Sequence, residues 1–142
     1  MVHPEVVLDT NVLVAGLRSR RGASFQLLSL VGSGRFGINI SVPLVLEYED
    51  VLHRPEIGIA LPRSQVEDVL DYHCAVARHH EIFFLWRPYL KDPRDDFVLE
   101  LAVKAACQFI VTFNERDFAG SEHFGVEAIT PGRFLRLIGA FS

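Results

Sequence analysis

The stretch VVLDTNVLV, at positions 6–14, decides the fold of this chain. A short run of apolar, mostly β-branched residues ends in three small polar residues at positions 9–11, and a second apolar run follows. This pattern predicts a buried parallel strand over residues 5–9 and a packed helix over about 11–18. The carboxyl ends of strands border the ligand crevice of open α/β sheets, so Asp9 is expected where such folds carry out chemistry. Helix capping is the alternative role for these polar residues, and further acids arriving at the same place would favour chemistry.

The composition is that of an ordinary globular protein. The chain has 142 residues, of which 49% are hydrophobic and 23% charged, so a single domain over residues 1–142 with a sizeable core is expected. The net charge of −4 argues against a protein that holds nucleic acid mainly by bulk positive charge. It does not exclude an enzyme that gathers acids in one pocket and places arginines at the rim.

The sequence indicates no targeting or membrane segment. The apolar run after residues 3–5 is too short for a signal peptide, and no run approaches the length of a membrane span. Cys74 and Cys107 have no metal-type spacing, and we expect both to be small core hydrophobes in predicted helices. A reducing cytoplasm, without membrane contact, is therefore the expected compartment.

Helical and strand-like patterns alternate along the rest of the chain. His79 and His80 fall at the C-terminus of one expected helix, where a histidine suits the macrodipole. The alternation predicts a mostly parallel central sheet with helices on both faces, which is a three-layer αβα sandwich. We expect further helices over about 23–31, 42–53, 61–80, 92–107 and 131–138, and further strands over 36–40, 82–86, 109–112 and 126–129.

Acids recur in three later segments. Glu47 lies among apolar neighbours in LEYEDVL, so it is expected near a packed face, where a carboxylate needs a partner. The DPRDD stretch at 92–96 has Asp92 as an N-cap and Pro93 at the first helical position. Its three acids exceed what capping needs, and they repel one another unless a cation is present. A second buried strand then ends in polar residues at 112–117. Four separate segments thus direct acids toward one crevice.

These stretches together resemble a PIN domain, the metal-dependent nuclease fold, and more narrowly the PIN toxins of bacterial and archaeal toxin–antitoxin pairs. The matching stretches, in order over nearly the whole chain, are VLDTNV at 7–12, LEYEDVL at 46–52, DPRDD at 92–96 and IVTFNERDF at 110–118. The family's acidic and last polar positions fall on Asp9, Glu47, Asp95, Asn114 and Asp117. Many relatives carry an acid where this chain has Asn114, and Asp96 is a second candidate for the third acid.

The resemblance implies hydrolysis of RNA phosphodiester bonds at these residues. Oxygen ligands without His or Cys favour Mg²⁺ or Mn²⁺ over zinc. Asp9, Asp95 and Asp117 would hold the ion, partly through water, with Glu47 as ligand or base. Thr112 and Asn114 would orient a carboxylate or a water. Without metal, at least one of the clustered carboxylates should have a raised pKa.

The same resemblance implies an RNA substrate, a small antitoxin partner and a homodimer. Basic residues near the expected cleft are candidates for contacts with substrate phosphates, or are plain solvated surface. They are Arg18, Arg20, Arg21 and Arg116.

Two other functional classes compete with a nuclease. A phosphoacceptor signalling module also uses Asp at strand ends with Mg²⁺, but it needs an acid pair at the first strand and a lysine after the last. The first strand here ends in Asp-Thr-Asn, and the only lysines are Lys91 and Lys104. A metal-free RNA- or protein-binding domain with a decayed site is the third interpretation.

Overall fold

The computed structural model describes residues 3–82, 90 and 92–140. Its centre is a parallel five-stranded sheet with the strand order β3-β2-β1-β4-β5, which places the strand that precedes Asp9 in the middle. The strands are β1 (Glu5–Leu8), β2 (Gly37–Ile40), β3 (Arg78–His79), β4 (Phe109–Val111) and β5 (Glu127–Ile129).

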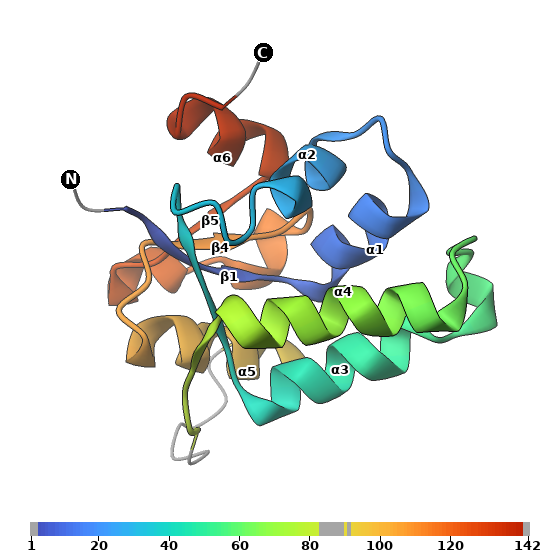
Figure 1. The fold of residues 1–142 in the computed structure, drawn as a ribbon. Helices are drawn as coiled ribbons and strands as arrows, with labels where there is room; N and C mark the ends of the chain where they lie inside the picture. Colours follow the sequence, from blue (N-terminus) through green and yellow to red (C-terminus); the bar gives the residue numbers. More distant parts are fainter. Residues whose placement is uncertain (1–2, 83–89, 91, 141–142) are drawn as a thin grey trace.

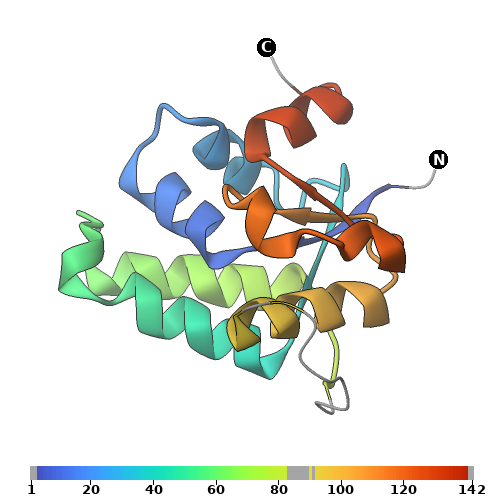
Figure 2. The ribbon, with the colours of Figure 1, turned by 180° about the vertical axis from the view of Figure 1, so that it is seen from behind.

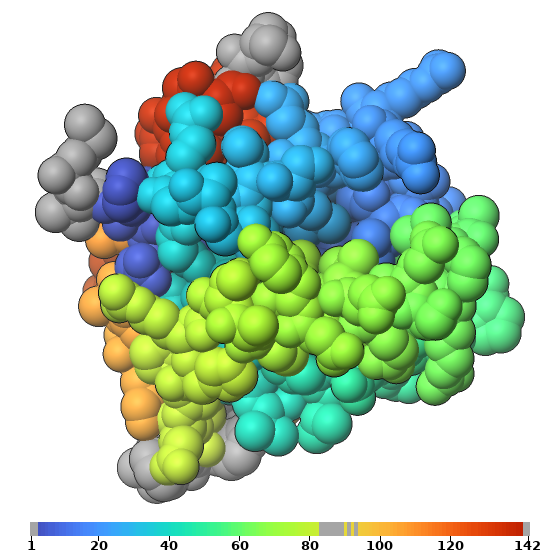
Figure 3. Space-filling model, in the orientation of Figure 1, coloured from blue at the N-terminus to red at the C-terminus, as the bar shows by residue number. Residues whose placement is uncertain are grey.

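Helices cover both faces of the sheet, as the alternating sequence pattern predicts. Helices α1 (Thr10–Arg18), α2 (Ala23–Ser29) and α6 (Pro131–Leu137) lie on one face (Figures 1 and 2). Helices α3 (Val42–Leu52), α4 (Arg63–Val76) and α5 (Pro93–Lys104) lie on the other. The α4 residues form a continuous band across the molecule between α1 and α3 in the space-filling view (Figure 3). The predicted three-layer αβα sandwich is confirmed.

Three short 3₁₀ helices complete the described elements. They are η1 (Pro55–Ile57), η2 (Glu115–Phe118) and η3 (Ser121–Phe124). Within the described part of the chain, no helix has the length and apolar character needed to cross a membrane.

The central strands are unbroken apolar runs because both of their faces are buried in the core. Val6 and Val7 of β1 and Ile110 and Val111 of β4 are completely buried, because helices cover the sheet from both sides. Leu99 of α5 is equally buried beneath these strands. The apolar runs therefore report burial on two faces, as the sequence pattern suggests.

The helix starts follow the cap signals of the sequence. Asp9, Ser41, Asp92 and Thr130 are the N-caps of α1, α3, α5 and α6, and each side chain accepts a hydrogen bond from a backbone N–H of the first turn. Most element ends lie within a residue or two of the predicted ones.

A strand that the sequence analysis did not predict pairs with β2. Ile82 is in no strand, and the rest of the predicted 82–86 segment lies outside the described residues. Helix α4 ends at Val76 rather than near His80, and the exposed residues Arg78 and His79 pair with β2 at the edge of the sheet. Backbone pairing decides this strand, since edge strands carry charged residues without an apolar pattern.

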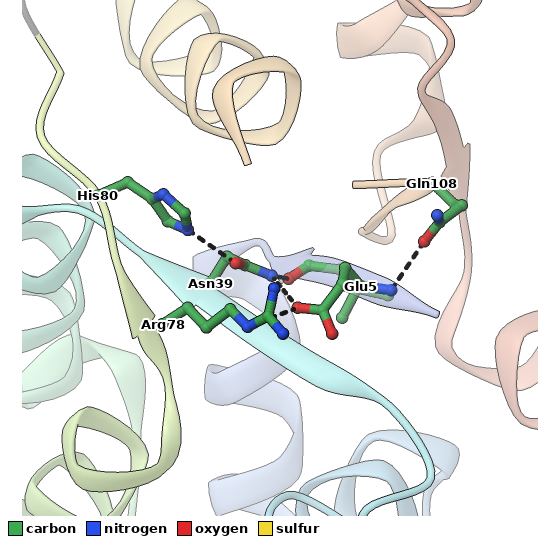
Figure 4. A network of polar contacts seen from close by, with 6 residues as sticks. Glu5, Asn39, Arg78, His80 and Gln108 are labelled. Carbon is green, nitrogen blue, oxygen red and sulfur yellow. Dashed lines mark hydrogen bonds and ion pairs between the residues drawn. The ribbon is translucent and has the colours of Figure 1, made fainter. Parts of the chain in front are cut away.

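A polar network connects β3 with β2 and with the start of β1 (Figure 4). Asn39 of β2 donates to Glu5 Oε1 at 3.0 Å, and Asn39 Oδ1 lies 2.9 Å from His80 Nε2. Arg78 approaches Glu5 Oε1 at 3.8 Å, and Gln108 accepts from the Glu5 backbone N–H. His79 and His80 thus belong to a strand edge and its network, not to the predicted helix C-terminus.

Helix α5 also ends earlier than predicted. It stops at Lys104, and Ala106 adopts a left-handed conformation with φ 55°. The Cys107 N–H then bonds to the Ala102 carbonyl at 2.8 Å, which closes the helix as a glycine usually would. Cys107 is therefore just outside the helix, but it is buried as expected, and burial raises the pKa of its thiol to about 12. Cys74 is half-buried on α4, and both cysteines are free thiols.

Candidate functional site

A cleft of about 370 Å³ opens at the carboxyl end of β1 and β4. It is lined by all five residues that the sequence analysis selected: Asp9, Glu47, Asp95, Asn114 and Asp117. The other residues that line it are Thr10, Asn11, Val14, Val51, Arg54, Ile57, Asp92 and Arg94. Segments far apart in sequence therefore bring four predicted acids to one place.

Each acid is delivered by a different element. Asp9 follows β1 directly and caps α1, while Glu47 projects from the middle of α3. Asp95 lies in the first turn of α5, and Asp117 lies in η2, after β4. The carboxyl ends of parallel strands share one edge of the sheet, which is why the strand-following acids meet there.

Hydrogen bonds fix the Asp9 carboxylate on both sides. Its Oδ1 accepts from the Thr10 N–H at 2.8 Å, which is the helix-capping bond. Its Oδ2 accepts from the Thr112 hydroxyl at 2.8 Å and from Asn11 Nδ2 at 3.4 Å. Capping and a place in the cleft are thus not alternatives for Asp9, because one side chain does both.

Thr10 and Asn11 belong to the site, although the sequence presents them simply as good capping residues. The Thr10 hydroxyl donates to Glu47 Oε2 at 2.5 Å and so ties α1 to α3. Asn11 Oδ1 accepts from the Phe113 N–H at 3.3 Å, which ties α1 to the segment after β4. In the sequence, only the position of Thr10 and Asn11 next to Asp9, within VLDTNV, could have indicated these two contacts.

Tyr48 joins α3 to the end of β1, next to the cleft. The side chain is 3% exposed, and its hydroxyl donates to the Leu8 carbonyl at the end of β1, one residue before Asp9. Burial, reinforced by the charges of Asp9 and Glu47, raises the pKa of Tyr48 well above its usual value. The phenol therefore stays protonated and holds the end of β1 against α3.

The cleft disfavours negative charge on two of its carboxyl groups. Burial raises the pKa of Asp9, and the charges of Glu47 and Asp117 add to the effect, while the hydrogen bonds from Thr112 and Thr10 oppose it. Burial together with the charges of Asp9 and Asp117 raises the pKa of Asp95 to about 7. These shifts meet the expectation for clustered carboxylates without a cation.

Asp95 and Asp96 differ in where their carboxylates lie. Asp95 lines the cleft. Asp96 Oδ1 instead accepts the Leu90 backbone N–H at 2.8 Å. Among the adjacent acids, Asp95 is thus the one placed with Asp9 and Asp117.

The donor chemistry of the cleft suits a hard divalent cation. Its carboxylate, amide and hydroxyl oxygens come without a histidine or cysteine among the lining residues. Within residues 3–82, 90 and 92–140, however, no three acidic, His or Cys side chains are arranged to hold an ion directly. The carboxylate oxygens of Asp9 and one oxygen of Glu47 are engaged in the hydrogen bonds described above.

Two arginines at the cleft were missed from the sequence. Arg54 lies 2.5 Å from Asp50 Oδ2, and Arg94 lies 3.0 Å from Asp92 Oδ2. Of the basic residues proposed from sequence, Arg18 lies near Gly58, the residue after the lining residue Ile57, since a Cβ on Gly58 would lie 4.0 Å from Arg18 Nε. All four basic candidates, Arg18, Arg20, Arg21 and Arg116, are exposed, and none of them is among the lining residues.

Known proteins share this architecture. The fold is similar to a chain in the crystal structure of VapBC2 from Rickettsia felis bound to a DNA fragment from their promoter. The TM-score is 0.58 at 15% sequence identity, and the match covers 87% of this chain and 98% of that chain. No protein of curated function matches the sequence significantly. The family model of the PIN domain matches residues 5–116, and the chain therefore belongs to the PIN domain family.

Proposed function

We propose that this protein is a metal-dependent endoribonuclease that hydrolyses phosphodiester bonds in the cleft. The observation that carries the proposal is the meeting of Asp9, Glu47, Asp95 and Asp117, from four separate segments, in one cleft. PIN domains are generally nucleases, which agrees with this arrangement. RNA is the substrate class implied by the resemblance to PIN toxins.

The ion required is Mg²⁺ or Mn²⁺, held by Asp9, Asp95 and Asp117, with Glu47 as a further ligand or as the base. A bound ion of this kind lowers the pKa of a water and neutralises charge on the phosphate. Raised pKa values at Asp9 and Asp95 support the proposal, because a cation would relieve the repulsion that raises them. Since no three side chains hold an ion directly as they lie, some of the carboxylates would reach it through water.

The neighbouring polar groups have positioning roles in this proposal. Thr112 and Asn11 fix the Asp9 carboxylate, and the Thr10 hydroxyl orients Glu47. Asn114 offers an amide where many relatives carry an acid, and it would orient a water or a carboxylate. Arg18, near the turn that holds Ile57, would contact a phosphate further along the strand.

We further propose that the enzyme is the toxin of a toxin–antitoxin pair in the cytoplasm. The structural similarity to a chain of the VapBC2 complex supports this assignment. A small antitoxin and a second copy of this chain are the partners that it implies. Co-expression with the product of an adjacent small gene, followed by co-purification, tests the antitoxin.

The phosphoacceptor alternative has less support. Modules of that class have the flavodoxin-like strand order 2-1-3-4-5. The order here is 3-2-1-4-5, and Thr112 is fully buried against Asp9.

Cleavage of single-stranded RNA by purified protein tests the proposal. We expect cleavage with Mg²⁺ or Mn²⁺, none with EDTA, and a loss of at least a hundredfold in Asp9→Asn and Asp95→Asn, because each removes a charged oxygen ligand. Asp96→Asn is the matched control, since its amide oxygen can still accept from Leu90. Cleavage by Asp9→Asn at the native rate would reject the site. Absence of Mn²⁺ binding and of cleavage in the native protein would favour a binding domain with a decayed site.

A further inference from the structure

A second pocket, also of about 370 Å³, lies beside the acidic cleft, between α3 and α5. These two helices run next to each other under the sheet in both ribbon views (Figures 1 and 2). The pocket is lined by Pro43, Leu44, Leu46, Glu47, Asp50, Val51, Arg54, Arg94, Phe97 and Val98. Four of these residues also line the cleft: Glu47, Val51, Arg54 and Arg94. A single wall of side chains therefore separates the pocket from the cluster of acids.

We propose that this pocket binds a base of the substrate RNA, next to the phosphodiester bond that is cut in the cleft. The inference rests on the proposed nuclease function and adds a subsite for the flanking nucleotide. It predicts that cleavage depends on the presence of a base at one position beside the cut.

The apolar part of the lining suits the face of a base. Leu46 of α3 is 59% exposed, and Phe97 of α5 is half-buried, so both present apolar surface to a ligand. Single-stranded RNA is bound mainly by unstacked bases that pack on aromatic side chains and guanidinium planes. The pocket offers both kinds of surface within one lining.

The two arginines in the shared wall are held by carboxylates. Arg54 is fixed by Asp50 at 2.5 Å, and Arg94 by Asp92 at 3.0 Å. Arg94 bonds to both carboxylate oxygens of Asp92, through Nε and Nη2, and this two-point contact orients the plane of its guanidinium, on which a base can stack. Asp50 and Glu47 add acceptors beside these donors, and that combination can read the hydrogen-bonding edge of a base.

The shape favours a base over a protein segment. A stable protein partner covers about 800 Å² on each side, whereas this feature is a compact hollow between two helices. Its wall is shared with the cleft, so a strand whose phosphate lies at the acids brings its next nucleotide to the pocket. A second copy of this chain is the competing occupant, and the experiments below distinguish it.

Kinetics with abasic substrates test the subsite. We expect removal of the base at one flanking position to lower kcat/KM about five- to a hundredfold in the native protein, the range that stacking of one base supplies. Leu46→Asn should cut the intact RNA more slowly and lose most of this discrimination. Val42→Asn, one turn earlier on α3, is exposed and does not line the pocket, so it should behave as the native protein does. Equal cleavage of intact RNA and of every abasic substrate would overturn the inference and leave the nuclease proposal intact.

Methyl NMR separates base binding from catalysis. A single-stranded hexanucleotide RNA, added with Mg²⁺ to the inactive Asp9→Asn protein, should shift the methyl signals of Leu46, Val51 and Val98 together. Such shifts would support the subsite even if the native protein cut no RNA. RNA that leaves these signals unchanged would overturn the inference, as would shifts that follow protein concentration without RNA, because a second copy would then occupy the pocket.

Discussion

At the scale of single residues, the sequence predicts the charged members of the site better than the groups that position them. Asp9 and Glu47 are recognisable because each lies beside an apolar run, and a carboxylate near a packed face is costly unless it has a partner. Thr10 looks like an ordinary cap residue, and only the folded chain shows its hydroxyl on Glu47. Arg54 and Arg94 could not be selected either, since exposed arginines on helices carry no periodic signal, and their place depends on how α3 packs against α5.

Thr112 offers a test of these positioning contacts. Its buried hydroxyl donates to Asp9 Oδ2 and accepts from the Asn114 N–H at 3.0 Å. Thr112→Val removes these bonds, and the one that the hydroxyl accepts from Asn11 Nδ2 at 3.4 Å, at nearly constant volume. The pKa of Asp9 should therefore rise further, and Mn²⁺ affinity should fall about 10- to 100-fold. Calorimetric titration with Mn²⁺ measures this loss. Thr112→Ser keeps the hydroxyl and should restore most of the affinity, and unchanged affinity in Thr112→Val would contradict the role given to this bond.

At the scale of elements, sequence patterns fix where helices begin more accurately than where they end. The caps at Asp9, Ser41, Asp92 and Thr130 are visible because their side chains make the capping bonds. The end of α5 is different, because Ala106 adopts a left-handed backbone that alanine seldom takes, and nothing in the sequence announces it. The strand Arg78–His79 escaped prediction for a related reason, since backbone pairing with β2 decides it and side-chain pattern does not.

The end of α5 predicts a stabilising substitution. Ala106 has φ 55°, a conformation that costs an L-residue about 1–2 kcal/mol but that glycine adopts freely. Ala106→Gly should therefore raise the free energy of unfolding by about 0.5–1 kcal/mol, after allowing for the greater freedom of glycine in the unfolded chain.

Urea unfolding with a neighbouring control checks this prediction. Ala105 has φ −81°, so Ala105→Gly gains no relief and should lower the free energy of unfolding by about 0.5–1 kcal/mol. Opposite signs at these adjacent positions would locate the strain at Ala106. A loss of stability in both variants would show that the left-handed turn is not strained.

At the scale of the whole molecule, the sheet gathers four acids at the carboxyl end of its central strands, β1 and β4. Glu5 at the start of β1, Asn39 within β2 and Arg78 of the edge strand β3 form a separate polar network. The layered fold and the end that carries the acids follow from the alternation of strands and helices. The strand order and the sharing of one wall by two pockets depend on long-range packing, which local patterns do not encode.

The acidic cleft should make the metal-free protein less stable at alkaline pH. Asp95 has a pKa of about 7 in the folded protein, against an ordinary value of 3.8, so its ionised form is disfavoured by folding. The resulting loss of folding stability is fully present above pH 7. It disappears as the pH falls from about 7 toward 4, because Asp95 takes up its proton in the folded protein at a higher pH than in the unfolded chain. His73 acts in the opposite direction, because burial lowers its pKa in the folded protein. Below about pH 6.5 the unfolded chain binds a proton at His73 more readily than the folded protein does, so acid destabilises the fold through this residue.

Comparing Asp95→Asn with the native protein cancels the contribution of His73 and isolates that of Asp95. In EDTA, we expect the variant to have the higher thermal midpoint at pH 8, with the difference shrinking toward zero near pH 4. Under the proposed function, Mn²⁺ added at pH 8 should reverse the order, because it binds the native protein more tightly than the variant, which lacks one carboxylate ligand. Asp96→Asn, whose position contacts Leu90 instead of the cleft, controls for the loss of a carboxylate from the same helical turn. If the difference in thermal midpoint stayed constant from pH 8 to pH 4, or if Mn²⁺ left it unchanged, the charges of Asp9 and Asp117 would not act on Asp95. The cleft would then have no need of a cation to hold its acids together.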